Sequence, residues 1–168
     1  MEFRKLWFAS GESRVGTVLV AVGDRGLAAV FLGDSRDRLC RELVRSFPGC
    51  ELLESEDALA DTLAGVVSAV NAPGTGFGLP LDMHGSDIEM AVWEALCRIP
   101  RGETRSYGQI AKALPVAATA QEVGAACAAN VLAVVVPCHR VLKADGSISG
   151  YRWGVPRKRQ LIEMERAA

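Results

Sequence analysis

The sequence has few histidines and few aromatic residues, and its five cysteines show no pairing or metal-binding pattern. Only His84 and His139 are present, and no two cysteines have zinc-finger spacing, so we expect no metal site. An odd number of cysteines without a disulfide framework fits a reducing compartment, for which the cytoplasm is the default. Nothing in the composition calls for a cofactor.

Long hydrophobic runs are also missing. No apolar stretch approaches the roughly 20 residues that cross a bilayer, and the start MEFRKLWFAS lacks the apolar segment of a signal peptide. Hydrophobic residues make up 49% of the chain and charged residues 23%, which argues against disorder. With 168 residues the chain can bury a real core, and we expect a monomer that does not associate with membranes.

The chain has no large excess of charge of either sign. The net charge is −1, but its two halves differ: 8 basic against 12 acidic residues up to Gly85, and 11 against 8 from Ser86 onward. The modest positive bias of the second half permits an anionic partner such as nucleic acid without requiring one.

The first half has the pattern of a hairpin followed by helices. Two β-rich runs within residues 17–32 are separated by Gly23-Asp24-Arg25-Gly26, which is typical of a hairpin turn. Helices are predicted after Asp34 or Ser35 and over residues 57–70. We interpret the intervening acidic cluster as a solvated edge and a helix start; it comprises Glu51, Glu54, Glu56 and Asp57.

A segment rich in glycine and proline, NAPGTGFGLPLD at residues 71–82, indicates a linker. We therefore expect two domains, at residues 1–80 and 81–168. Beyond it, two S-x-x-E/Q capping boxes begin at Ser86 and Ser106 and predict helices. The second of these is short, residues 107–114, and a helix of small residues follows through Ala129. This pair is compatible with a helix-turn-helix or with two packed helices.

The chemistry of the chain centres on residues 131–142, VLAVVVPCHRVL. The valines at 134–136 predict a buried strand that Pro137 ends, which places Cys138 where the backbone leaves a sheet. Positive charge on His139 and Arg140 favours the thiolate, so we expect a thiol more acidic than a free cysteine. The alternative is that Cys138 is a small buried hydrophobe, as the other four cysteines are interpreted to be.

Four features together resemble the O6-alkylguanine-DNA alkyltransferases, also called methylated-DNA-protein-cysteine methyltransferases. They are Tyr107, Asn130, the PCHRVL run at 137–142 and the SGYRWG run at 149–154. The resemblance extends from about Ser86 to Glu165, is weaker before that, and is strongest to the carboxy-terminal domain of the bacterial adaptive-response methyltransferase. It implies an amino-terminal α/β domain with a ribonuclease-H-like sheet, followed by a mostly helical domain with a helix-turn-helix.

The resemblance also implies a function, the single-turnover transfer of an alkyl group from the O6 atom of a guanine in DNA to the protein's own cysteine. It makes Cys138 the alkyl acceptor, His139 the base that acts through a water, and Glu165 the carboxylate that orients His139. Asn130 becomes a hinge that braces the cysteine turn. Guanine contacts are implied for Tyr107, Val141 and Ser149, and DNA contacts for Gln121, Ala125, Ala128 and Arg140.

The chain departs from the family's pattern at position 121. The family has an intercalating arginine there, and this sequence has Gln121, followed by Glu122. Lysines and arginines supply most of the sequence-independent affinity for DNA, and the predicted recognition helix has none. The sequence therefore leaves alternatives open: repair with weakened duplex binding, an alkyl acceptor for a non-duplex or small-molecule substrate, an alkylation sensor, or a non-catalytic lesion binder.

Overall fold

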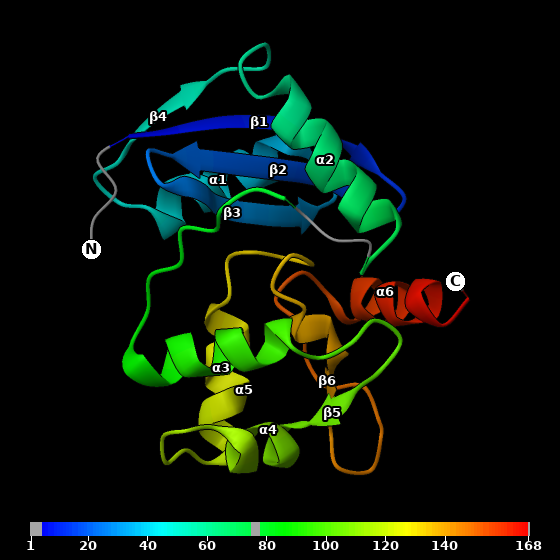
Figure 1. Ribbon diagram of the computed structural model, residues 1–168. Coiled ribbons are helices and arrows are strands. Elements are labelled where there is room, and N and C mark those ends of the chain that lie inside the picture. Colours follow the sequence, from blue (N-terminus) through cyan, green and yellow to red (C-terminus); the bar gives the residue numbers. More distant parts are fainter. Residues whose placement is uncertain (1–4, 75–77, 168) are drawn as a thin grey trace.

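The computed structural model describes residues 5–74 and 78–167 and shows a mixed α/β fold, with a sheet and two helices above a mostly helical part (Figure 1). The sheet part contains β1 (Lys5–Ser13), β2 (Gly16–Gly23), β3 (Gly26–Gly33), α1 (Arg36–Ser46), β4 (Glu51–Glu54) and α2 (Ala60–Asn71). The helical part contains α3 (Asp87–Cys97), β5 (Arg105–Ser106), α4 (Tyr107–Ala113), α5 (Ala120–Ala129), a 3-10 turn (Cys138–Arg140), β6 (Val141–Leu142) and α6 (Val155–Ala167).

The four-stranded sheet has the order β3-β2-β1-β4, in which β1, β2 and β3 are antiparallel neighbours and β4 runs parallel to β1. The β2–β3 pair confirms the predicted hairpin. Strands β1 and β4 were not predicted. The acidic cluster begins within β4, whose two glutamates lie exposed at its ends, so its interpretation as a solvated edge is confirmed in part.

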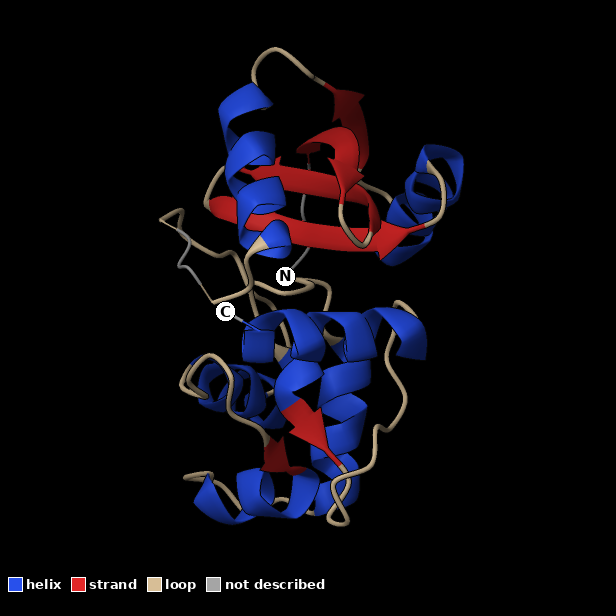
Figure 2. Ribbon diagram, turned by 90° about the vertical axis from the view of Figure 1, so that its right-hand side faces the viewer, coloured by secondary structure: helices blue, strands red, loops and turns tan. Residues whose placement is uncertain are grey.

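The two helices of the sheet part cover opposite faces of the sheet (Figures 1 and 2). α1 begins after Ser35, whose side chain accepts a hydrogen bond from the amide of Arg38, and it buries Leu39 and Leu43 against the sheet. α2 was expected from residue 57 and begins at Ala60. Both helices therefore form where the apolar periodicity predicts them.

Capping boxes fix the starts of three helices in the second half. Ser86 and Ser106 open α3 and α4 as predicted, and Thr119 with Glu122 opens α5 in the same way. The small side chains of α5 allow close packing: Trp93 of α3 donates its indole N–H to the carbonyl of Ala126 at 2.9 Å. The predicted pair of helices is thus present, and α4 and α5 pack against each other and against α3.

The predicted linker at residues 71–82 includes residues 75–77, which lie outside the described residues. The last part of the segment is hydrogen-bonded to β3: the amide of Leu27 donates to the carbonyl of Pro80, and the amide of Asp82 donates to the carbonyl of Leu27. Gly26 at this junction has a φ of +133°, and a Cβ there would meet the Pro80 oxygen at 2.3 Å. None of the helices within residues 5–74 and 78–167 is long and apolar enough to cross a bilayer.

The predicted buried strand at residues 134–136 is wrong. These residues form a turn, in which the amide of Val136 donates to Leu132 and Val134 has a φ of 68°. Only Leu132 pairs with the sheet, through a bridge to Val30. Val134 and Val136 are buried and Val135 is partly buried within the turn rather than along a strand, and an apolar β-branched run does not distinguish the two arrangements. The segment therefore reverses direction just before Cys138.

Candidate active site

Cys138 lies in the wall of a cavity of about 350 Å³ within the helical part. The cavity is formed by α4, α5, the loop before α6 and α6 itself, and the other lining residues include Tyr107, Cys127, Tyr151 and Lys158. Its size is within the range of small-molecule pockets. Cys138 is 3% exposed, so a reagent must enter the cavity to reach the sulfur.

Asn130 ends α5 and fixes the turn that carries Cys138. Its Nδ2 donates to the carbonyl of Val136 at 3.0 Å and lies 3.4 Å from the Cys138 sulfur, while its Oδ1 accepts from the amide of Leu132 at 2.9 Å. One buried side chain thus holds both ends of the turn and the reactive atom. This bracing explains how Val134 can keep a backbone conformation that is unfavourable for a β-branched residue.

His139, Arg140 and Glu165 form a buried cluster next to Cys138. Nε2 of His139 lies 2.8 Å from Oε1 of Glu165, and Arg140 donates to the same carboxylate from Nε and Nη2 at 2.9 and 2.7 Å. Nη1 of Arg140 donates to the carbonyl of Ile99 at 2.6 Å. Arg140 is 6% exposed, so the structure does not support its predicted contact with DNA and assigns its guanidinium to Glu165.

The expected acidity of Cys138 is wrong for the protein at rest. Burial raises the pKa of the Cys138 thiol and outweighs the opposing effects of the Asn130 hydrogen bond and the Lys158 charge. Burial likewise lowers the pKa of His139, although Glu165 opposes this. Cys138 therefore carries a protonated thiol and His139, the next residue in the chain, a neutral imidazole, so Cys138 needs a base when it reacts.

The charges around His139 allow it to act as the base that Cys138 needs. Burial raises the pKa of Glu165, but hydrogen bonds and charges from His139 and Arg140 outweigh it and lower the pKa to about 2. The carboxylate is thus ionised and holds Nε2 of His139. Nδ1 of His139 is buried and has no hydrogen-bond partner in the part of the chain that the structure describes. This nitrogen is the atom of the cluster that remains able to take a proton.

Tyr107 and Ser149, both predicted to contact guanine, are joined by a hydrogen bond between their side-chain oxygens. Lys158 of α6 extends this chain, because its Nζ donates to Oγ of Ser149 at 3.0 Å and to the carbonyl of Gly150 at 3.4 Å. Lys158 is 1% exposed and makes no ion pair among the described residues. Burial lowers the pKa of this lysine.

Sequence reasoning missed Lys158, because it lies in the charged run Arg157-Lys158-Arg159 at the start of the last helix. The spacing of residues in this helix could have revealed Lys158. Lys158 precedes Leu161 by three residues and Glu165 by seven, which places all three on one face of a helix. That face is the buried face of α6. A lysine without a carboxylate partner on a buried face is a sign of function.

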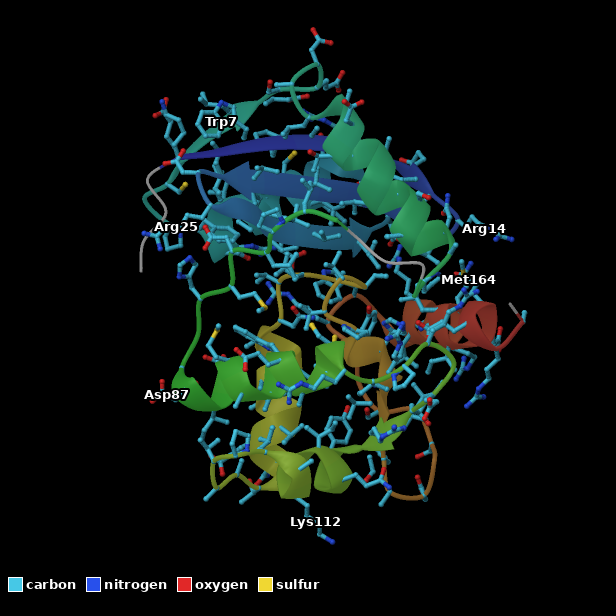
Figure 3. The ribbon with its side chains drawn as sticks, in the orientation of Figure 1. Trp7, Arg14, Arg25, Asp87, Lys112 and Met164 are labelled. Atoms are coloured by element: carbon cyan, nitrogen blue, oxygen red, sulfur yellow. The ribbon has the colours of Figure 1, made fainter. Side chains whose placement is uncertain are left out.

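The predicted DNA-contacting residues of α5 share one face. Gln121, Ala125 and Ala128 are exposed and follow at intervals of four and three residues, and Ala128 also lines the cavity. Lys112 on α4 is the only lysine or arginine between Tyr107 and Asn130, and its side chain points outward from the end of the molecule (Figure 3). Val141 is fully buried in β6, where it pairs with Arg105.

Comparisons with known proteins identify the family of the chain. Residues 87–167 match a family model described as 6-O-methylguanine DNA methyltransferase, DNA binding domain. The chain is 41% identical over 158 residues to the bifunctional transcriptional activator/DNA repair enzyme Ada of Escherichia coli, covering 94% of this chain and 45% of Ada. It is 37% identical over 143 residues to the inducible methylated-DNA–protein-cysteine methyltransferase of Bacillus subtilis, covering 83% of this chain and 79% of that protein.

The structure also superposes on solved structures. A crystal structure of Mycobacterium tuberculosis OGT in complex with DNA aligns with a TM-score of 0.77 and 32% identity, covering 96% of this chain and 93% of that one. The chain spans less than half the length of Ada but most of the Bacillus and Mycobacterium proteins. The protein therefore belongs to the family of methylated-DNA–protein-cysteine methyltransferases.

Proposed function

We propose that this protein transfers an alkyl group, such as methyl, from the O6 atom of guanine in DNA to the sulfur of Cys138. Each molecule acts once, because a thioether is not reversed. The observation that carries the proposal is the arrangement around the sulfur: a buried cysteine, held by Asn130, lines a cavity, and the histidine that follows it in the chain has a free buried nitrogen. The family membership supports the choice of substrate.

In the proposed reaction, the Cys138 thiol loses its proton through a bridging water to Nδ1 of His139. The sulfur then attacks the alkyl carbon, the bond between that carbon and O6 breaks, and its electron pair stays on the guanine, which takes up a proton. Glu165 stabilises the imidazolium that forms, and Arg140 holds Glu165 in place. Glu165 and Arg140 thus position His139, the general base, and do not touch the substrate.

We propose that Tyr107 and Ser149 contact the guanine, Val141 supporting the site through its backbone, and that Lys158 holds Ser149 in place. Lys158→Met should slow transfer about tenfold, as expected for the loss of one positioning group. At neutral pH it should also raise the free energy of unfolding, because burial lowers the pKa of this lysine and its charged form therefore destabilises the folded state.

The measurements are single-turnover transfer rates and thermal denaturation across pH. The stability advantage of Lys158→Met should shrink as the pH rises toward the ordinary lysine value of 10.5, where the parent lysine is neutral in both states. A variant that is less stable at neutral pH yet transfers at the parent rate contradicts the assignment. Lys143→Met, at an exposed position outside the cavity and outside α4 and α5, serves as the control and should change neither property.

We further propose that α4 and α5 act as a helix-turn-helix whose exposed face, Gln121, Ala125 and Ala128, meets the DNA. The sheet order β3-β2-β1-β4, with three antiparallel strands and a parallel β4, supports a ribonuclease-H-like first domain. Residues 1–80 and 81–168 form the two proposed domains, in a cytoplasmic protein that acts as a monomer.

Gln121→Arg should increase transfer from methylated duplex about tenfold. An arginine there can fill the gap that an extruded base leaves and attract the phosphates, whereas glutamine is shorter and neutral. Transfer from free O6-methylguanine should stay unchanged, since a free base needs no extrusion. Single-turnover rates on both substrates test this, and an unchanged duplex rate shows that another residue fills the gap.

A second function follows from the lack of cations on α5, which favours a substrate other than duplex DNA. In this alternative, Cys138 accepts the alkyl group from a single strand, a free nucleoside or a small alkylating molecule, either for repair or as an alkylation sensor. Intact-protein mass after incubation with methylated duplex, methylated single strand and free O6-methylguanine separates the two functions. Duplex repair predicts the fastest gain of one alkyl group with duplex; the alternative predicts the reverse order.

A further inference from the structure

An arginine of the cavity wall connects the helical part of the molecule to α1 of the sheet part. Arg152 lines the cavity, and its Nη1 donates to the carbonyl of Ala128 at the end of α5 at 3.4 Å. Its Nε and Nη2 donate to Oε1 of Glu42 at 3.3 and 3.2 Å, and Nη2 also donates to Oγ of Ser46 at 3.3 Å. The last two turns of α1 therefore lie beside the cavity and beside the end of α5.

α1 carries three exposed arginines next to the residues that hold Arg152. Arg38 precedes Glu42 by four residues and Arg45 follows it by three, so both are its neighbours on the helix surface. Arg41 precedes Arg45 by four residues and continues the same row. We call Arg38, Arg41 and Arg45 the α1 arginine row.

The charges of this row are largely uncompensated. Arg41 and Arg45 make no side-chain hydrogen bond or ion pair within residues 5–74 and 78–167, and Arg38 has only a pair of 3.6 Å with Asp34. Like charges four residues apart disfavour a helix, so the row is not explained by the stability of α1. Glu42 does not neutralise it either, because its carboxylate is paired with Arg152.

We propose that the α1 arginine row binds the phosphate backbone of the DNA strand that presents its alkylated guanine to the cavity. This inference rests on the proposed function. When a base occupies the cavity, its sugar and phosphates remain outside it, next to Arg152 and the end of α5, which is where α1 ends. Arginine suits phosphate because its planar guanidinium donates two parallel hydrogen bonds.

The proposal assigns to α1 the electrostatic role that α5 cannot perform. Between Tyr107 and Asn130 the only cation is Lys112. The first half of the chain has more acidic than basic residues overall, yet α1 contains four arginines against Asp37 and Glu42. Binding of this kind is independent of sequence, and it positions the strand while the cavity recognises the base.

The test is the double variant Arg41→Gln/Arg45→Gln in the full chain, measured against a methylated duplex and against free O6-methylguanine. Duplex affinity should fall about tenfold at low salt, and the slope of log K against log salt should decrease by about 0.9 for each phosphate contact that is lost. Duplex transfer at subsaturating protein should fall in parallel. Transfer from the free base should stay at the parent rate, because neither arginine lines the cavity.

Two further variants make the result specific. Arg41→Lys/Arg45→Lys keeps both charges and should retain most of the affinity and of the salt slope. The control Arg14→Gln/Arg98→Gln removes two exposed arginines that neither line the cavity nor contact Arg152, and should bind duplex like the parent. Arg14 lies at a far edge of the sheet part (Figure 3).

An unchanged affinity and salt slope in Arg41→Gln/Arg45→Gln, or an equal loss in the control pair, overturns the proposal. Loss of transfer from the free base in the double variant also contradicts it, since the row then affects the chemistry. A parent protein that transfers no alkyl group from any substrate contradicts the proposed function instead, and the binding measurement still reports on the arginine row separately.

Discussion

Cys138→Ser should reduce alkyl transfer by a factor on the order of a thousand or more, while leaving the fold and any DNA binding intact. A serine hydroxyl is a much weaker nucleophile toward an alkyl carbon than a thiolate, and it is far less acidic than a thiol. Its oxygen can still accept the hydrogen bond from Asn130, so the turn at residues 131–137 should keep its shape. Single-turnover transfer from methylated duplex measures the loss.

Cys127→Ser is the matched control, because Cys127 lines the same cavity. Burial raises the pKa of Cys127 to about 12, which leaves almost no thiolate, and the proposed reaction assigns it no base. This variant should transfer at close to the parent rate. If Cys127→Ser loses transfer and Cys138→Ser keeps it, the acceptor has been assigned to the wrong thiol.

Glu165→Gln should have two large effects. It leaves the buried guanidinium of Arg140 without its carboxylate, and breaking a buried ion pair in this way costs about 3–5 kcal/mol of unfolding free energy. It also removes the anion that stabilises a protonated His139, which should slow transfer about a hundredfold. Chemical denaturation and single-turnover rates measure the two effects.

The double variant Glu165→Gln/Arg140→Gln separates them. Removing both charges should recover part of the lost stability, because no unpaired charge then remains buried. Transfer should not recover, since the imidazole still lacks its carboxylate. Transfer at the parent rate in either variant would show that Glu165 is structural and that another group orients His139.

The same carboxylate predicts a pH dependence. The pKa of Glu165 is lowered from 4.5 to about 2 in the folded protein, so its contribution to stability is complete above about pH 4.5 and is lost as the pH falls toward 2. Unfolding of the parent protein should therefore become easier over this range. Glu165→Gln, which has no group to titrate there, should show a flatter dependence.

The helices of this fold could be predicted because their signals are local. Ser86 and Ser106 with their partners three residues later fixed two helix starts to the residue. β1 was missed although it pairs with the next strand, β2, whereas β4 was missed for a physical reason: it pairs with β1 from a distant part of the chain and is only four residues long, with a glutamate at each end. Strand signals of that length are weak without knowledge of the partner strand.

Some features of the candidate site could likewise be predicted from the sequence, and others could not. The segment at Pro137–Arg140 could be identified from the chain, and the resemblance supplied roles for Asn130 and Glu165. The conformation of residues 134–136 could not be predicted, because valine is equally suited to a buried strand and to a buried turn held by Asn130. Nor could the acidity of Cys138, since neighbours in sequence suggest positive charge whereas burial in the fold dominates the pKa.

The role of Arg140 illustrates the same limit. In the sequence it is a cation beside the reactive cysteine, and it could serve DNA, the thiolate or another residue. The fold decides, because α6 brings Glu165 against it from 25 residues away. Lys158 lies on the same buried face of α6 as Glu165 and lines the cavity, and no short sequence motif contains it.

The most direct test of the central claim is the site of alkylation in the unmodified protein. The protein is incubated with duplex DNA containing O6-methylguanine, digested, and its cysteine peptides are analysed by mass spectrometry. We expect one methyl group per molecule, on the peptide that contains Cys138, with Cys40, Cys50, Cys97 and Cys127 unmodified. A methyl group on any of those four with Cys138 free, or none on any cysteine while the methylated guanine is consumed, would contradict it.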